Sequence, residues 1–299
     1  MSTSTIILRQ LVIMFLYMAV GFALFRAKLV TKEGSRALAN LLIYAVLPCV
    51  IFKSFCVQRT PEKTKELLVS LGAALVLLLL AMAVSHLVFR KRPIDDIGTA
   101  FSNAGFIGLP LVTAAFGADH VFFAAGFVAL LNVLQVTYGQ AVMAHDRSLV
   151  SPRAIVRIPI VIAAVLGLIV FFTGISIPEL SMTAISAFTA LNGPLAMVII
   201  GVYLAQTDLK SMFTDKNVYL ACLVRLVLIP AVTVAVVKLT MGGYPEIAKT
   251  LLVVACAPIG SNVAVYAQKL NQDYTYAVKI VCITTILSLL TLPVVMLFV

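Results

Sequence analysis

Long apolar stretches, separated by short charged or Gly/Pro-containing segments, run through the whole chain. Ten of them come near the roughly 20 residues that a helix needs to cross the hydrocarbon of a bilayer. They cover residues 5–25, 34–56, 66–89, 97–117, 120–144, 155–174, 180–206, 217–240, 247–268 and 274–298. None alternates apolar and polar positions as a strand would, and hydrocarbon offers no partner to an open backbone. The pattern predicts an all-α integral membrane protein with ten transmembrane helices.

Composition agrees with this fold class. Hydrophobic residues make up 62% of the 299 positions and charged residues 11%, whereas a soluble domain has about 45–50% and about 25%. Arg9 and Gln10 interrupt the first stretch and no basic region precedes it, so we expect a retained helix rather than a cleaved signal peptide. The five cysteines lie in or at the ends of apolar spans without C-x-x-C spacing, and we expect them to act as small buried hydrophobic residues.

The distribution of basic residues predicts an orientation. Alternate loops hold thirteen Lys and Arg on one side and seven on the other, the termini included. Because cytoplasmic loops carry the excess, we expect loops 26–36, 90–96 and 145–154 to be cytoplasmic and both termini extracytoplasmic. The net charge of +10 mostly reflects this bias. No segment is long enough to form a basic soluble face, so we predict the lipid bilayer, and no nucleic acid, as a partner.

The chain also repeats a pattern. Phe-Gly-Ala-Asp at 116–119 and Leu-Asn-Gln-Asp at 270–273 each follow an interrupted span and precede a long one. Superposing Asp119 on Asp273 gives an offset of 154 residues, which places segment 103–110 over segment 257–264. We therefore predict two five-helix repeats, one in each half of the chain (1–150 and 151–299). Five is an odd number, so the second repeat enters the membrane inverted.

The two matched segments are the most helix-hostile stretches inside any span, and such pairs in inverted repeats indicate a secondary transporter's binding site. Gly and Pro interrupt the helical hydrogen bonds, and the half-helix N-termini then offer unpaired donors and partial positive charge to an anion. The candidate substrate-binding residues here are Asn103, Gly105, Pro110, Pro258, Gly260, Ser261 and Asn262. Ordinary kinks are the alternative, as we expect at the lone prolines 48, 159, 194, 230 and 293.

Arg225 is a further candidate because it is the most deeply placed charge, about 12 Å into its span at 1.5 Å per residue. A guanidinium can hold a carboxylate with two parallel hydrogen bonds, so Arg225 could bind an anionic substrate. The alternatives are an extended side chain that reaches the interface, or an ion pair with Asp208 or Asp215. No Asp or Glu lies near the centre of a span.

Three sets of residues carry a family resemblance over essentially the whole chain. They are Gly21-Phe22 through Leu41-Leu42-Ile43-Tyr44-Ala45-Val46-Leu47-Pro48, then Asn103-Ala104-Gly105-Phe106-Ile107-Gly108-Leu109-Pro110, and Ala257-Pro258 to Tyr266. Their order and spacing resemble the auxin efflux carrier family, which is similar in architecture to the bile-acid sodium symporters. The short loop at 145–154 resembles that of compact bacterial members.

The resemblance implies that helices 4 and 9 are broken and cross. It also implies a scaffold of helices 1, 2, 6 and 7, with residues near Pro48 and Asn192 on one wall of the site, and a moving domain of helices 3–5 and 8–10. The implied substrate is a small organic anion such as malate, malonate or an auxin-like acid, moved by an elevator-type motion. A cell-membrane location, as in the bacterial inner membrane, follows from the same likeness. A homodimer could form through the scaffold.

Other function classes remain as alternatives. A membrane enzyme would need a nucleophile with its base or a metal cluster, and the sequence has no H-E-x-x-H or G-x-S-x-G. We therefore expect no enzyme, catalytic residue, metal or other cofactor. A channel would need a polar filter, and a receptor an extramembrane domain, and neither is visible. Proton coupling, sodium coupling and facilitated diffusion are all compatible with the sequence.

Overall fold

The computed structural model describes residues 3–146, 152–207 and 215–298. Within them the backbone is helical, and the single β-type pairing is an isolated bridge between Ser102 and Ile259. The helices are α1 (Thr3–Arg26), α2 (Lys32–Leu41), η1 (Leu42–Val46), α3 (Leu47–Phe55), α4 (Pro61–Phe89), α5 (Pro93–Ala100), η2 (Ala104–Gly108), α6 (Leu109–Phe116), η3 (Ala118–His120), α7 (Val121–Leu134), η4 (Gln135–Gly139), α8 (Gln140–Ala144), α9 (Pro152–Ile155), α10 (Pro159–Thr173), α11 (Glu179–Ala190), α12 (Asn192–Ala205), α14 (Lys216–Leu223), η6 (Val224–Leu228), α15 (Ile229–Thr240), α16 (Pro245–Cys256), α17 (Asn262–Lys269), α18 (Tyr274–Val295) and η7 (Met296–Phe298).

Seven continuous helical segments of the described residues are long and apolar enough to cross a membrane. They are Thr3–Arg26, Lys32–Phe55, Pro61–Phe89, Ala118–Ala144, Glu179–Ala205, Lys216–Thr240 and Tyr274–Phe298. The other three predicted spans contain the short helix α10 and the interrupted pairs α5/α6 and α16/α17. The all-helical membrane fold is confirmed, and ten spans are compatible with it. Exposed Leu16, Leu68 and Leu239 are more than half accessible, as lipid-facing side chains would be.

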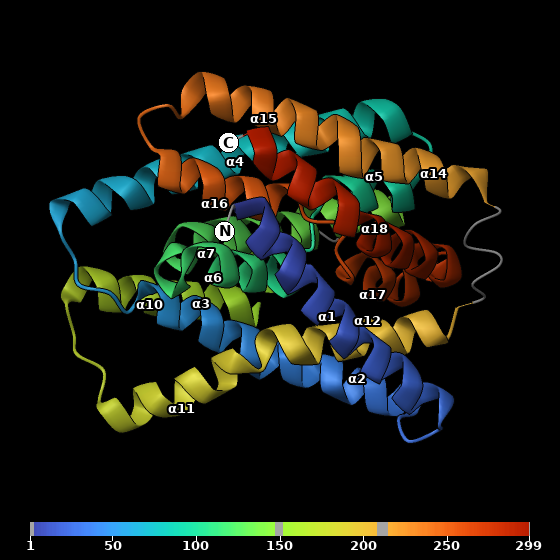
Figure 1. The fold of residues 1–299 in the computed structure, drawn as a ribbon, viewed down its shortest axis with the longest axis horizontal. Coiled ribbons are helices and arrows are strands. Elements are labelled where there is room, and N and C mark those ends of the chain that lie inside the picture. Colours follow the sequence, from blue (N-terminus) through green and yellow to red (C-terminus); the bar gives the residue numbers. More distant parts are fainter. Residues whose placement is uncertain (1–2, 147–151, 208–214, 299) are drawn as a thin grey trace.

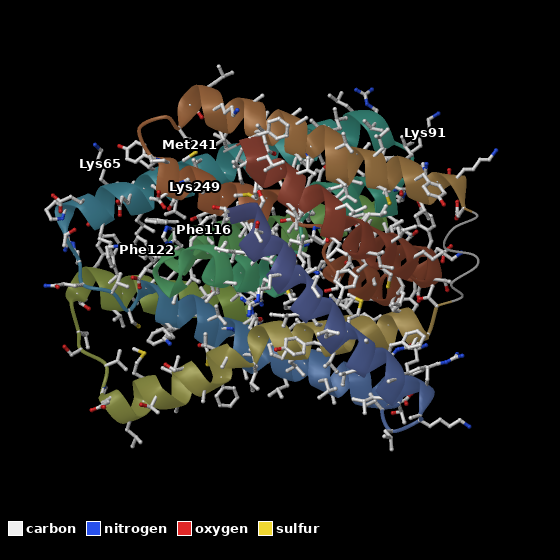
Figure 2. The ribbon with its side chains drawn as sticks, viewed as in Figure 1. Lys65, Lys91, Phe116, Phe122, Met241 and Lys249 are labelled. Atoms are coloured by element: carbon white, nitrogen blue, oxygen red, sulfur yellow. The ribbon has the colours of Figure 1, made fainter. Side chains whose placement is uncertain are left out.

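The helices form two groups (Figure 1). The lower part of the view contains α2, α3, α10, α11 and α12, whereas α4, α5, α14 and α15 lie in the upper part. Helix α1 runs from the centre of the view toward the lower right and packs closely on α12: a Cβ added at Gly201 would come within 2.0 Å of the Met18 carbonyl oxygen. Lys65, near the start of α4, and Lys91, two residues beyond its end, lie at opposite ends of the molecule (Figure 2). The long axis of the view therefore follows the direction of α4.

Proline does not end every helix in which it occurs. Pro48, Pro110 and Pro230 each lie two residues after the end of a π-helical segment. These segments are η1, η2 and η6 respectively. A proline has no N–H and its ring crowds the carbonyl four residues earlier. The wider π-turn accommodates the missing N–H and the ring of the proline, and the helix continues beyond it. Most of the helix-hostile segment 103–110 is for this reason helical, and the break lies just before it.

The break in the first half spans residues 101–103, between α5 and η2. Phe101 is extended, with φ −110° and ψ 116°, and it is fully buried. In the second half the break spans residues 257–261, between α16 and α17. There Ala257 has φ −57° and ψ 154°, because the residue before a proline is pushed out of the helical region. Pro258 thus ends α16 through its neighbour.

The two breaks lie against each other. The Asn103 N–H donates to the Pro258 carbonyl at 2.7 Å, and the Gly260 N–H donates to the Phe101 carbonyl at 3.0 Å. These bonds use backbone groups that the interrupted helices leave without helical partners. Gly260 permits the approach, since a Cβ there would lie 3.1 Å from the Ser102 carbonyl oxygen. Segments 154 residues apart in the predicted superposition therefore meet in the middle of the fold.

Candidate functional site

A small cavity of about 30 Å³ lies where the two breaks meet. Its lining comes from both breaks and from helices of the other group: Ile43, Leu47, Ser102, Asn103, Gly105, Phe106, Leu131, Asn132, Ile160, Gly260, Ser261 and Asn262. Five of the candidates, Asn103, Gly105, Gly260, Ser261 and Asn262, are thus brought together. We call this space the inner cavity.

Two side-chain atoms of residues that line the inner cavity have no partner among the described residues. Asn103 is 4% exposed, yet its Nδ2 donates to no described atom, and the Ser102 hydroxyl is also unpaired. Buried polar groups are nearly always hydrogen-bonded, so unpaired ones call for an explanation. An amide donor and a hydroxyl that line a cavity are free to bind a ligand there.

Asn262 is placed at the cavity by a partner that the sequence analysis missed. Its Nδ2 donates to Gln135 Oε1 at 3.0 Å, and Gln135 is only 1% exposed. Asn132, one turn before Gln135, also lines the cavity and donates to the Val128 carbonyl at 2.8 Å. Two polar residues three apart on one face of an apolar span were the available signal.

Where the two breaks meet, the N-terminal ends and the C-terminal ends of the interrupted helices face different groups. The inner cavity is lined by residues at the starts of η2 and α17, namely Asn103, Gly105, Ser261 and Asn262. Helix N-termini have unpaired N–H groups and a partial positive charge. The C-terminal ends of α5 and α16 carry the opposite polarity, and they face a different group.

Arg225 provides that group. It is 1% exposed, and all three guanidinium nitrogens donate to backbone carbonyls: Nε to Ala257 at 2.8 Å, Nη1 to Thr99 at 3.0 Å, and Nη2 to Ala255. Thr99 belongs to the last turn of α5, and Ala255 to the last turn of α16. One cation therefore satisfies the carbonyls that both interrupted helices leave open.

This position differs from every sequence interpretation of Arg225. The side chain does not line any of the cavities described here, and it points neither to the interface nor to Asp215. Asp208 lies outside the described residues. The physical reason is that the break frees carbonyl oxygens at membrane depth, and the planar guanidinium fits several of them at once.

Neither of the two candidate prolines lines the inner cavity. Pro258 contributes the carbonyl that binds Asn103, whereas Pro110 lines a separate cavity of about 350 Å³. That second cavity also touches Asn192, whose Nδ2 donates to the Gly105 carbonyl at 2.9 Å while its Oδ1 has no partner among the described atoms. Asn192 thus lines the second cavity and binds Gly105, which lines the inner one.

A larger cavity of about 500 Å³ continues from the inner one, with which it shares Ile43, Asn132, Ile160 and Asn262. We call it the vestibule. Two cations line it, Arg157 before α10 and Lys269 at the end of α17, and both are exposed. Its described lining includes no Asp or Glu. The path from the vestibule to the inner cavity is therefore positive and rich in amide groups.

Comparison with known proteins agrees with these observations. The family model described as "Membrane transport protein" matches residues 6–153 and 143–296. A "Putative malonate transporter" of Rhizobium meliloti is 25% identical over 284 residues, covering 89% of this chain and 88% of that protein. An uncharacterized transporter of Methanocaldococcus jannaschii is 23% identical over 282 residues, covering 87% and 88%. The chain is a multi-pass membrane protein that belongs to the membrane transport protein family of the auxin efflux carrier type.

Proposed function

We propose that this protein is a secondary transporter that binds a small carboxylate in the inner cavity and the adjoining part of the vestibule. One observation carries the proposal: two interrupted helices meet, and the starts of both second halves line the same cavity. This geometry directs two partial positive charges and several N–H donors at one point. It does so without a permanent cation in the inner cavity itself.

The charges around the cavity favour an anion over a cation or a neutral ligand. Asn103 Nδ2 and the Ser102 hydroxyl supply unpaired hydrogen-bonding groups, and Arg157 and Lys269 line the entrance. Carboxylate oxygens accept hydrogen bonds and carry negative charge, so they suit every one of these groups. The positive vestibule would also raise the local concentration of an anion.

Size and the comparisons suggest the first compounds to test. The inner cavity is large enough for about one small polar group, so one carboxylate can enter it while the rest of the molecule occupies the vestibule. A relative named as a putative malonate transporter makes malonate the first candidate and malate the second. An auxin-like acid would have to place its ring in the vestibule.

The proposed movement divides the helices of Figure 1 into a scaffold and a mobile group. The two proposed five-helix repeats, 1–150 and 151–299, would each supply helices to a scaffold of spans 1, 2, 6 and 7 and to a mobile group of spans 3–5 and 8–10. Both breaks belong to the mobile group, whereas Leu47 and Ile160 line the cavity from the scaffold. A sliding of one group against the other would carry the bound anion across the membrane. A homodimer through the scaffold would hold that group still.

A ligand screen tests the binding part of this proposal. Purified protein should show a higher melting temperature with malonate or a related dicarboxylate than with matched chloride, because a ligand that binds the native state stabilises it. Asn103→Ala should reduce that increase at the same ligand concentration, since it deletes the unpaired amide at the cavity. A set of mono- and dicarboxylates that leaves the melting temperature unchanged at millimolar concentration would contradict the proposal.

Counterflow in proteoliposomes tests the transport part. Vesicles loaded with unlabelled malonate should take up labelled malonate transiently, with saturation. A carrier exchanges its substrate in this way, but a channel does not, so linear uptake without saturation would favour the channel alternative.

A further inference from the structure

Two consecutive buried carboxylates begin α5, outside the cavities described above. Asp95 is 2% exposed and Asp96 is 1% exposed. Ionisable side chains buried within a membrane protein are rare and usually functional. Because the two residues are neighbours on one short helix, differences in their surroundings show what each of them does.

Asp95 is fully compensated. Its Oδ2 lies 2.7 Å from Arg92 Nε, and its Oδ1 accepts from the Tyr276 hydroxyl at 2.6 Å. Arg92 also donates to the same hydroxyl at 3.0 Å. An arginine keeps its charge at all ordinary pH values, so Asp95 has a permanent counter-charge. These contacts fix α5 to α18, which is a structural role.

Asp96 is compensated only in part. Its Oδ2 lies 2.8 Å from His86 Nδ1, while its Oδ1 is buried and has no partner among the described atoms. His86 is 49% exposed at its side chain and lies three residues before the end of α4, so it gives the buried carboxylate an accessible edge near that end of the span. Histidine is the side chain that gains and loses a proton near neutral pH. The partner of Asp96 is therefore a residue type that can exchange a proton, whereas the partner of Asp95 is an arginine that stays charged.

The pair is connected to the crossing through a very short helix. Thr99 lies one turn after Asp96, and its hydroxyl is 2.7 Å from the Asp95 carbonyl and 2.9 Å from the Ser85 hydroxyl on α4. The Thr99 carbonyl in turn accepts from Arg225 at 3.0 Å. Asn103, in the inner cavity, follows four residues later. A change of charge at Asp96 acts on an eight-residue helix whose other end forms the break.

We propose that the His86–Asp96 pair is a proton-binding site through which the transporter couples substrate movement to a proton gradient. This proposal rests on the proposed function. A proton from the aqueous phase would enter at the exposed edge of His86, join the pair and cancel the negative charge of Asp96. After the mobile group has moved, the proton would leave to the opposite side. No other reactant is consumed.

Other ionisable groups on the elements packed around α5 bear on its pH response. Tyr276 on α18 donates to Asp95, and Arg225 on η6 donates to the Thr99 carbonyl. Tyr138 on η4 interacts electrostatically with Asp96. Asp215, just before α14, acts electrostatically on Asp95. The remaining ionisable side chains on α14 and α17, and on α18 beyond Tyr276, are Lys216, Tyr219, Cys222, Tyr266, Lys269, Tyr274, Lys279 and Cys282. Among all these groups His86 is the only histidine.

The test uses the whole protein in proteoliposomes with labelled malonate and the membrane potential clamped at zero. Counterflow is measured at equal pH on both sides, and net accumulation is measured with an imposed pH difference or with a sodium gradient. One coupled proton supports about tenfold accumulation per pH unit. We expect the wild type to show counterflow and accumulation driven by the pH difference.

Asp96→Asn should keep counterflow and lose most of the pH-driven accumulation. Asp95→Asn is the matched control, which should keep the pH response although it loses the ion pair with Arg92. If Asp96→Asn does not fold, His86→Gln on the half-exposed side of α4 tests the same point and should also lose pH-driven accumulation.

Two results would overturn the proton proposal while leaving the transporter proposal intact. They are full pH-driven accumulation in both Asp96→Asn and His86→Gln, or wild-type accumulation driven by sodium and not by pH. A wild type without counterflow for malonate or any related carboxylate would instead contradict the proposed function.

Discussion

At the scale of single residues, the crossing is organised by two side chains with opposite tasks. Arg225 satisfies carbonyl oxygens at the C-terminal ends of α5 and α16, whereas Asn103 leaves a donor unpaired at the cavity beside the N-terminal ends. Both residues are buried, so water cannot easily replace a lost hydrogen-bond partner at either of them. Each residue therefore makes a distinct prediction.

Asn103→Ala should weaken substrate binding about tenfold, because one hydrogen bond to a charged group contributes roughly 1.5 kcal/mol. Asn262→Ala should weaken it too, through the loss of the contact with Gln135. Isothermal titration of purified protein with the carboxylate found in the screen measures both. Asn217→Ala, an exposed asparagine at the start of α14, is the control and should bind normally. Unchanged affinity in both site variants would remove these residues from the site.

Arg225→Ala should lower stability strongly, because it leaves the Thr99, Ala255 and Ala257 carbonyls without this donor, at roughly 1–3 kcal/mol for each unsatisfied group. Arg225→Lys should lie between, since an ammonium keeps the charge and loses the planar fork. Thermal unfolding in detergent measures the order. Arg59→Ala is the control, because the exposed Arg59 binds a single carbonyl, that of Phe172. An Arg225→Ala protein of normal stability that binds no anion would restore the direct substrate role.

At the scale of helices, close packing between small residues joins spans that are far apart in sequence. Gly21 on α1 and Gly201 on α12 face each other's helix so closely that an added Cβ would lie 2.0 Å from a backbone oxygen in each case. Small residues allow such backbone approach in membranes, where packing rather than water exclusion holds helices together. The α1–α12 pair would provide the rigid part against which a mobile group can slide.

Gly201→Ala should therefore destabilise the protein, because α1 and α12 must move apart to admit one methyl group. Gly72→Ala is the matched control: it lies on α4 with no atom within 4 Å of the added Cβ. The control should be neutral or more stable, since alanine favours a helix over glycine by up to about 1 kcal/mol. Melting temperatures of the two variants decide. Equal behaviour would mean that the α1–α12 contact is looser than the structure shows.

At the scale of the whole molecule, basic residues and helix directions together predict how the protein lies in the membrane. Lys91 lies at one end of the molecule and Lys65 at the other (Figure 2), as expected for ends of one long span. Of the alternate loops, the set that includes Lys91 carries the larger number of Lys and Arg, so that end should be cytoplasmic. The vestibule residues Arg157 and Lys269 belong to the same set.

Single cysteines introduced into a cysteine-free background test this orientation in intact cells. Positions in loops 26–36 and 90–96 should be protected from an impermeant thiol reagent, and a cysteine at Thr60 or Gly242 should react. Permeabilised cells provide the control, in which all positions react. Labelling of loops 26–36 and 90–96 in intact cells would reverse the predicted topology and would place the vestibule on the outside.

The sequence by itself determined that the chain lies in a lipid bilayer, that its elements are helices, and where the helices break to within a few residues. Those features follow from local chemistry, since long apolar runs demand helices in hydrocarbon and Pro258 forces Ala257 out of a helix. Only the tertiary structure decided which groups meet. Arg225 was open to several interpretations because the carbonyls that it binds lie 30 to 126 residues away in the chain, and nothing local marked His86 as the partner of Asp96, which it becomes through the packing of α4 on α5. A partner chosen by packing leaves no signal in local sequence, because hydrogen bonds across helices depend on distance in space.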